Sequence, residues 1–211
     1  MITINDCIFQ IGKPDKDNDF SFLGTGFVVP GYILTAGHVV SFRSMIKTEE
    51  VIWLQDGRWH SEHSGYIVDY NKVDYAFYIC PEVQSLLQLA ETDAVEGDVL
   101  EINCFLPDNN GVPQRILCNC EVKDDIGLFY KKIVPTKRMT HGASGCPVFK
   151  DGKVYGILTG GSKKGEHSRE YWLKDYQPED IDRFSQDDCW MLKASYIKKQ
   201  IETYCRTIAK D

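Results

Sequence analysis

The sequence contains no long apolar run. Hydrophobic residues make up 43% of its 211 residues but are spread over short stretches, whereas a membrane span needs roughly 18–20 consecutive apolar residues. Residues 1–19 also lack a basic segment followed by an apolar one, which is the pattern of a secretory leader. We therefore expect no membrane association and a cytoplasmic location.

Clusters of basic residues are missing as well. The 24 Lys and Arg residues are scattered, and 31 acidic residues give a net charge of −7. This balance disfavours binding to nucleic acids and anionic membranes, whose surfaces repel an acidic protein. No group of His, Glu and Asp has the spacing of a metal site, so we expect no metal and no cofactor.

Cysteine, in contrast, is abundant, with eight residues. Most lie inside apolar, strand-like stretches such as "VDYAFYIC" (73–80), which favours buried free thiols. The "CNC" of residues 118–120 is the closest pair, and alternation along a strand places both sulfurs on one face. A metal site or a disulfide is the alternative, but no second Cys or His pair accompanies it.

Strand signals dominate the rest of the sequence. Stretches of about 4–8 residues rich in Val, Ile, Tyr and Phe are bounded by Gly, Pro, Asn or Asp. Residues 107–111 and 150–153 are typical hairpin turns, in which glycine supplies a positive φ. So many short strands predict an all-β barrel or sandwich.

Three other segments divide the chain. Residues 81–98 separate two halves as a linker with room for a helical turn, and residues 194–211 carry apolar positions at the 3–4 residue spacing of an amphipathic helix. The expected units are 1–85, 86–193 and 194–211. Within the second of these units, the polar stretch 162–189 is too long for a plain connection, so we expect it to gate access or to dock a regulatory protein.

The chemistry-bearing residues begin with the small-residue turn "HGASGCP" (141–147). Acyl transfer needs a nucleophile, a base and donors for the oxyanion. Ser144 offers a hydroxyl and an N–H group, and Gly142 offers an N–H group with no Cβ to obstruct approach. An ordinary β-turn serine is the alternative, because the motif alone is weak.

Two upstream residues complete the set. His38 follows a strand in "LTAGHVV" (34–40), where small residues leave it room to face a cleft, although a structural histidine is the alternative. Asp74 begins the apolar stretch 75–79. A buried carboxylate is costly unless it is hydrogen-bonded, and holding an imidazole in one tautomer is such a use.

The order His, Asp, Ser and the surrounding motifs resemble the trypsin/chymotrypsin-like serine peptidases, in particular the HtrA-type and related intracellular bacterial domains. The resemblance rests on "LTAGHVV", "VDYAFYI" and "HGASGCPVF…VYGILTGG" and extends over nearly the whole chain. It implies two antiparallel six-stranded β-barrels with the active site in the cleft between them, followed by a C-terminal α-helix.

The resemblance also implies roles. His38 would be the general base, Asp74 its orienting carboxylate and Ser144 the nucleophile, with the N–H groups of Gly142 and Ser144 as the oxyanion hole. The strand "GILTGG" would bind an extended peptide through Thr159, Gly160 and Gly161. The two glycines are expected to leave the mouth of the pocket open.

Two positions depart from the digestive members of the family. Ala143 stands where they have an Asp that pairs with a new amino terminus, so we expect no dependence on N-terminal cleavage. Cys146 stands where Gly is common, and it is a poor alternative nucleophile because Ser144 already occupies the turn. For the P1 pocket, Arg138 would favour an acidic side chain, unless it is a solvated surface residue. Thr140 and His141 could instead form a polar wall for Glu or Gln.

These features predict a serine endopeptidase acting on protein or peptide substrates. A cytoplasmic protease that is always active would be dangerous, so we expect narrow specificity or control by a partner, as in proteases encoded beside bacterial defence systems. The alternative is a pseudoprotease, a module that binds peptides in the same cleft without cleaving them.

Overall fold

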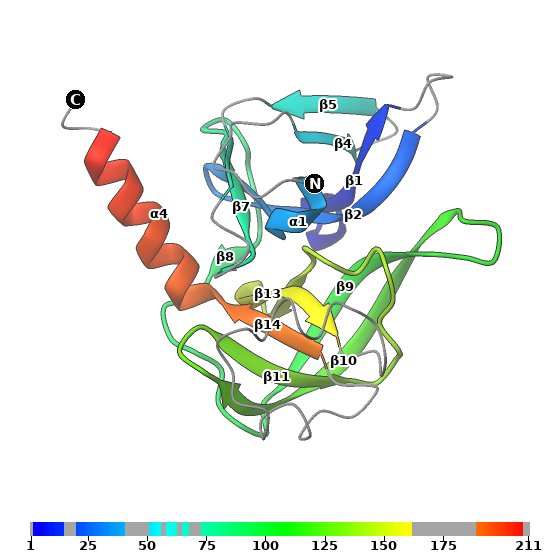
Figure 1. Cartoon of the computed structure of the whole chain (residues 1–211). Helices are drawn as coiled ribbons and strands as arrows, with labels where there is room; N and C mark the ends of the chain where they lie inside the picture. Colours follow the sequence, from blue (N-terminus) through cyan, green and yellow to red (C-terminus); the bar gives the residue numbers. More distant parts are fainter. Residues whose placement is uncertain are drawn as a thin grey trace.

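The computed structural model describes residues 2–14, 20–40, 51–55, 58–62, 65–67, 73–161 and 189–208. Two β-sheets fill most of this part of the chain, one above the other in the view of Figure 1. The long stretch 162–188, on which the regulatory prediction rests, lies outside the described residues. The predicted all-β fold with a closing helix is confirmed.

The N-terminal half forms a seven-stranded antiparallel sheet in the order β5-β4-β1-β2-β3-β7-β6. It begins after the short 3-10 helix η1 (Ile4–Cys7), and the four-residue helix α1 (Gly37–Val40) follows β3. The strands are β1 (Ile8–Pro14), β2 (Phe20–Val29), β3 (Tyr32–Thr35), β4 (Val51–Gln55), β5 (Arg58–Glu62), β6 (Gly65–Ile67) and β7 (Ala76–Ile79).

The C-terminal half forms a closed barrel of six strands. The order β12-β9-β10-β11-β14-β13 closes through the pairing of β12 with β13, and β8 adds a short parallel strand at β13. These strands are β8 (Gln88–Leu89), β9 (Val99–Pro107), β10 (Pro113–Ile126), β11 (Tyr130–Pro135), β12 (Pro147–Lys150), β13 (Lys153–Gly161) and β14 (Cys189–Lys193). The segment expected as a linker therefore contains an extended strand, and no helical turn occurs within it.

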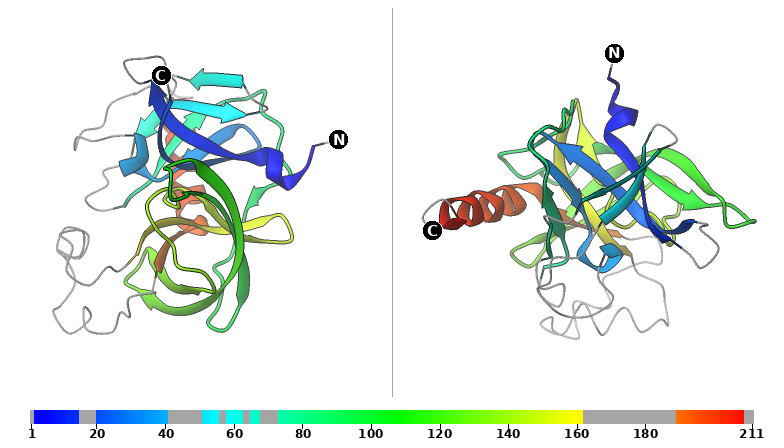
Figure 2. Two further views of the ribbon diagram at one scale, coloured as in Figure 1. Left: turned by 90° about the vertical axis from the view of Figure 1, so that its right-hand side faces the viewer. Right: turned by 90° about the horizontal axis from the view of Figure 1, so that it is seen from above.

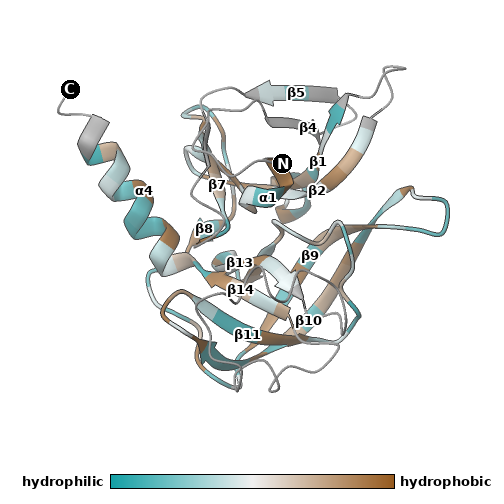
Figure 3. Ribbon diagram, in the orientation of Figure 1, coloured by the Kyte–Doolittle hydropathy of each residue, from teal (hydrophilic) through white to brown (hydrophobic). Residues whose placement is uncertain are grey.

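Alternation of side chains explains how each half builds its core. Buried residues alternate with exposed ones in the second half of β10 and with half-buried ones in β11, whereas all five residues of β14 are buried. Figure 3 shows the corresponding change between apolar and polar segments. All eight cysteines are free. Cys118 and Cys120 point to one buried face, as the sequence predicts, and pack beside Cys104 and Cys146 inside the barrel.

The C-terminal helix α4 (Ala194–Ile208) contacts both halves. Ile197 and Ile201 are buried in the main core. The ring of Tyr196 packs on Phe129 of the C-terminal half at 4.5 Å between centroids, and the ring of Tyr204 packs on Phe77 of the N-terminal half at 5.6 Å. The right-hand view of Figure 2 shows the helix projecting outward from the sheets, with its C-terminal end farthest from them. Among the described helices, none has both the length and the apolar character that crossing a bilayer requires.

Candidate active site

His38 and Asp74 lie side by side because β3 and β7 are neighbouring strands. Their pairing aligns Thr35 with Ala76, so α1, which follows β3, lies beside the residues that precede β7. The ring Nδ1 of His38 is 2.6 Å from Oδ2 of Asp74, and the backbone N–H of His38 donates to Oδ1 at 2.9 Å. Both carboxylate oxygens of Asp74 therefore bind His38, one at the backbone and one at the ring, and the ring Nε2 lies on the side away from Asp74.

The surroundings of this pair favour a basic imidazole. Asp74 is fully buried, and its own N–H donates to the hydroxyl of Tyr130 on β11, 3.0 Å away in the other half. Burial lowers the pKa of His38, but the charge of Asp74 and its hydrogen bond together raise that pKa above its ordinary value of 6.5. The His38 side chain is 32% exposed, so the ring is partly open to solvent.

Ser144 lies in a turn shaped by two glycines. The N–H of Ala143 donates to the carbonyl of Thr140 at 3.2 Å, and Gly142 has a φ of +104°. This combination is the signature of a type II turn, in which the third residue must adopt a positive φ. Gly145 follows with a φ of +89°, and the half-buried Ser144 stands between the two turns.

The hydrogen bonds of this turn leave two donors unused. The N–H groups of Ala143, Gly145 and Cys146 donate to backbone carbonyls. Within the described part of the chain, the N–H groups of Gly142 and Ser144 donate to no acceptor. These are the two groups that the resemblance assigns to an oxyanion hole. A developing negative charge between them would satisfy both.

The turn packs directly on the segment that carries His38. A Cβ on Gly145 would lie 2.2 Å from the carbonyl oxygen of Thr25 and 2.9 Å from the backbone nitrogen of Ala36. A Cβ on Gly24 would lie 2.7 Å from Val39 and 3.0 Å from the carbonyl oxygen of Ser144. The serine turn therefore packs both on β2 and on the segment 36–39 that carries His38.

The strand predicted to bind substrate, β13, contacts the serine turn near its C-terminal end. The N–H of Gly145 donates to the carbonyl of Leu158 at 2.7 Å, and the next residue, Thr159, forms a β-bulge against β14. Thr159 is 4% exposed, and its hydroxyl has no hydrogen-bond partner among the described residues. Bulges of this kind occur beside active sites, where they redirect a side chain.

Gly160 makes room for the protein's own indole. A Cβ at Gly160 would lie 2.3 Å from Nε1 of Trp190, its partner on β14. The space expected to open the pocket mouth is thus occupied by Trp190 at this residue. The other predicted specificity residues, Arg138, Thr140 and His141, are exposed; Arg138 precedes the turn, and Thr140 and His141 are its first two residues.

Cys146 is fully buried beside Cys104, and burial raises the pKa of its thiol well above 9.0, as do the neighbouring cysteines. A thiol that stays protonated is a poor nucleophile. This supports the preference for Ser144. Among the described residues, no group of three His, Cys, Asp or Glu side chains could hold a metal ion.

Sequence reasoning missed three residues that contact the site, namely Thr25, Tyr130 and Trp190. Only Thr25 had a local signal. It lies between two glycines in "GTG", and a Cβ on Gly24 or on Gly26 would come within 3.0 Å of other atoms. Tyr130 and Trp190 sit in ordinary strand patterns that say nothing of a site.

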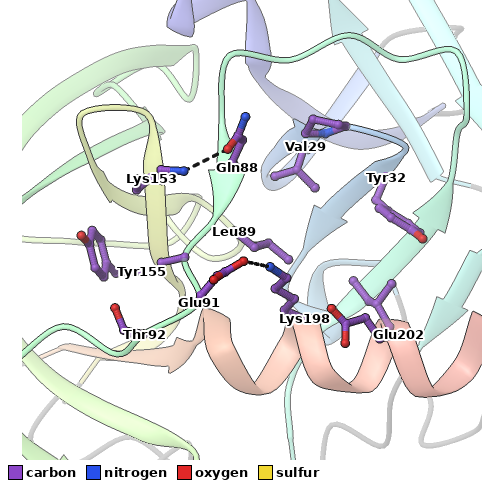
Figure 4. A pocket seen from close by; sticks show the side chains of 13 residues that line it. Val29, Tyr32, Gln88, Leu89, Glu91, Thr92, Lys153, Tyr155, Lys198 and Glu202 are labelled. Atoms are coloured by element: carbon purple, nitrogen blue, oxygen red, sulfur yellow. Dashed lines mark hydrogen bonds and ion pairs between the residues drawn. The ribbon is translucent and has the colours of Figure 1, made fainter.

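A cavity of about 590 Å³ lies elsewhere, between the β2–β3 hairpin, β8 and α4. Figure 4 shows Lys198 paired with Glu91 and Lys153 bonded to Gln88 at its rim. None of the predicted catalytic residues lines this cavity. The chemistry of His38, Asp74 and Ser144 therefore defines the candidate site, and the cavity does not.

Comparison with known proteins gives likeness at the level of structure. No family model and no curated protein matches the sequence. The Rv3671c protease from M. tuberculosis in its active form superposes with a TM-score of 0.64 at 17% identity, over 94% of this chain and 81% of that one. Kallikrein-related peptidase 10 gives 0.64 at 13% identity, over 96% of each chain.

A viral enzyme shares the same architecture. The catalytically active tobacco etch virus protease complexed with product gives a TM-score of 0.56 at 9% identity, over 90% of this chain and 73% of the other. Identities this low establish the architecture alone. The chain has the trypsin/chymotrypsin-like fold.

Proposed function

We propose that this chain, with its trypsin/chymotrypsin-like fold, is a serine endopeptidase that cleaves peptide bonds through a Ser144-His38-Asp74 triad. One observation carries the proposal: an imidazole held by a buried carboxylate lies in the segment that packs on the serine turn, and two N–H groups of that turn have no acceptor among the described residues. A histidine kept for packing alone would need neither the turn nor the donors.

The pair would prepare the nucleophile. Because Asp74 accepts the Nδ1–H of His38, the neutral ring presents its lone pair at Nε2. Nε2 would take the proton of the Ser144 hydroxyl as its oxygen attacks the scissile carbonyl carbon. The bond from the serine oxygen to that carbon forms while the carbonyl π bond becomes an oxyanion.

The turn would stabilise that oxyanion through the N–H groups of Gly142 and Ser144. Removing one such donor from a protease typically costs about 10²–10³ in kcat. Collapse of the intermediate breaks the peptide bond, and His38 gives its proton to the leaving amine. Water then repeats the sequence on the acyl-enzyme and restores Ser144.

An extended peptide would reach the serine along β13. This strand pairs with β14 up to Gly161, but on its other edge β12 pairs only as far as Ile157. Residues 159–161 therefore have an open edge in the part of the chain that the structure describes. An open edge accepts a peptide as an added strand, and here the edge begins where Leu158 binds Gly145 of the serine turn.

Arg138 would select an acidic P1 side chain. It is exposed, and within the described residues its guanidinium has no hydrogen-bond or ion-pair partner. A free guanidinium recognises a carboxylate through charge-assisted bonds. Thr140 and His141, on the same approach to the turn, would add polar contacts.

The test is cleavage profiling on a peptide library together with labelling by a serine-directed fluorophosphonate. We expect wild type to cut and to label, and Ser144→Ala to do neither. Ser195→Ala is the matched control, because Ser195 is a half-buried serine like Ser144 but lies on α4, where it donates to Asp93. Folded wild type that binds peptides without cutting or labelling would identify the peptide-binding alternative. Unchanged P1 preference in Arg138→Glu would remove the proposed role of Arg138.

A further inference from the structure

Thr25 connects the two halves of the molecule at the serine turn. It lies on β2 of the N-terminal sheet and is fully buried. Its N–H donates to the carbonyl of Ser144 at 2.9 Å, and its hydroxyl donates to the carbonyl of Gly142 at 2.8 Å. The same hydroxyl accepts from the N–H of Phe105 at 3.0 Å, and its carbonyl accepts from the hydroxyl of Thr35 at 2.8 Å. Every polar atom of Thr25 is therefore used.

Two of these bonds hold the carbonyl groups of Gly142 and Ser144. These are the same residues whose N–H groups have no acceptor among the described residues. The peptide between Gly142 and Ala143 is bound at its oxygen by Thr25 and at its N–H by the carbonyl of Thr140. A planar peptide held at both ends cannot rotate. The N–H groups of Gly142 and Ser144 belong to the two neighbouring peptides, so the fixed plane between them restrains the directions in which both can point.

We propose that Thr25 is a positioning residue that sets the oxyanion-binding turn from the opposite half of the molecule through its side-chain hydroxyl. The role rests on the proposed function of that turn. Its chemical basis is the absence of a charged partner for the turn: Ala143 is an apolar residue with 1% exposure, so no ion pair at that position orders the loop. The hydroxyl of Thr25 supplies the missing restraint.

The alternative is that Thr25 only fills space between the halves. A hydroxyl bonded to backbone elsewhere provides the matched comparison. Ser85 donates to the carbonyl of Val28 at 2.7 Å and accepts from the N–H of Leu87 at 2.9 Å. Its bonding pattern equals that of Thr25, and Val28 is on the same strand. Ser85 makes none of its bonds to the serine turn.

The experiment measures kcat and KM separately for Thr25→Val, Thr25→Ser and Ser85→Ala on a peptide that wild type cleaves. Valine keeps the shape and removes the hydroxyl, so we expect kcat to fall by about 10²-fold, the size of a lost oxyanion donor, with KM nearly unchanged. Serine keeps the hydroxyl and should restore most of kcat. Thr25→Ala gives the same comparison if the valine variant does not fold.

A second readout is independent of hydrolysis. In ¹H–¹⁵N NMR spectra, the amide signals of Gly142 and Ser144 should shift or double in Thr25→Val and stay in place in Ser85→Ala. Unmoved signals with a kcat loss no larger than that of Ser85→Ala would overturn the proposal for Thr25 while leaving the peptidase intact. Moved signals in a protein that neither cuts nor labels would support Thr25 and refute the peptidase.

Discussion

Two glycine-containing turns of the C-terminal half differ in what surrounds them. In the hairpin between β9 and β10, Gly111 has a φ of +80°, and a Cβ there would meet nothing within 4 Å. In the serine turn, Gly142 and Gly145 also have positive φ, but a Cβ would lie 2.8 Å from the carbonyl of Phe105 or 2.2 Å from that of Thr25. Gly111 is needed only for its positive φ, whereas Gly142 and Gly145 are also needed because neighbouring backbone lies too close for a side chain.

The bonds that hold the two turns differ in the same way. Asp108 closes the hairpin locally, because its carboxylate accepts from the N–H groups of Asn110 and Val112 at 2.8 and 2.9 Å. Thr25 holds the serine turn from 117 residues away. The described side-chain bonds of the hairpin are therefore local, whereas the serine turn combines local backbone bonds with bonds from Thr25 in the other half.

Gly145→Ala should have the largest effect of the changes that separate these turns. The new Cβ would contact backbone and the hydroxyl of Thr35 at 2.2 Å, at a φ that L-residues rarely adopt. Overpacking typically costs about 1–3 kcal/mol, and the left-handed backbone adds about 1–2 kcal/mol. We expect urea unfolding to show a loss of about 2–5 kcal/mol of stability and labelling of Ser144 to disappear. Stability within about 1 kcal/mol of wild type would mean that the halves are not docked as described.

Asp74→Asn should separate loss of chemistry from loss of shape. Both turns remain, but the imidazole loses its negative partner, and a triad that loses this charge typically loses about 10⁴ in kcat. Because the charge and hydrogen bond of Asp74 raise the pKa of His38 above 6.5, the acid limb of kcat/KM in wild type should lie above that value. In the variant the limb should move to lower pH.

The same shift links pH to folding. A raised pKa in the folded state means that protonated His38 contributes stability below its unfolded pKa, and that this contribution is lost as pH rises through the folded pKa. Urea unfolding of wild type against Asp74→Asn on both sides of this window measures it. A pH–rate profile with the same acid limb in both proteins would show that His38 is not the base.

Gly142→Ala should reduce activity more than stability. The Cβ would lie 2.6 Å from the ring of Phe22, which can move, and 2.8 Å from the carbonyl of Phe105, which is backbone. Relief by a type I turn would rotate the peptide before residue 142 and turn its N–H away from the oxyanion. We expect kcat to fall by about 10²–10³. Adding Phe22→Ala would remove the clash with the ring but neither the clash with the Phe105 carbonyl nor the positive φ, so kcat should stay low in the double variant.

The sequence predicts those parts of the site whose geometry follows from neighbouring strands. The pairing of β3 with β7 brings His38 to Asp74, and the small residues around Ser144 indicate a turn. The extended conformation of β8 does not follow from its own sequence, because it depends on pairing with β13, which lies far along the chain. The same limit applies to Tyr130 and Trp190, and the two glycines beside Thr25 indicate a close approach without identifying its partner. Their contacts arise from docking of the halves and from the bulge at Thr159, which no local pattern encodes.

Gly111→Ala should have the smallest effect and completes the comparison. Nothing obstructs the Cβ, so the cost is the positive φ alone, about 1 kcal/mol. Asparagine tolerates that backbone better, so Gly111→Asn should recover most of the loss in urea unfolding. Neither change should alter kcat or labelling of Ser144, because the hairpin closes on its own aspartate. A large loss of activity in either variant would show that the two turns are coupled, and that local closure of the hairpin is not enough to isolate it from the site.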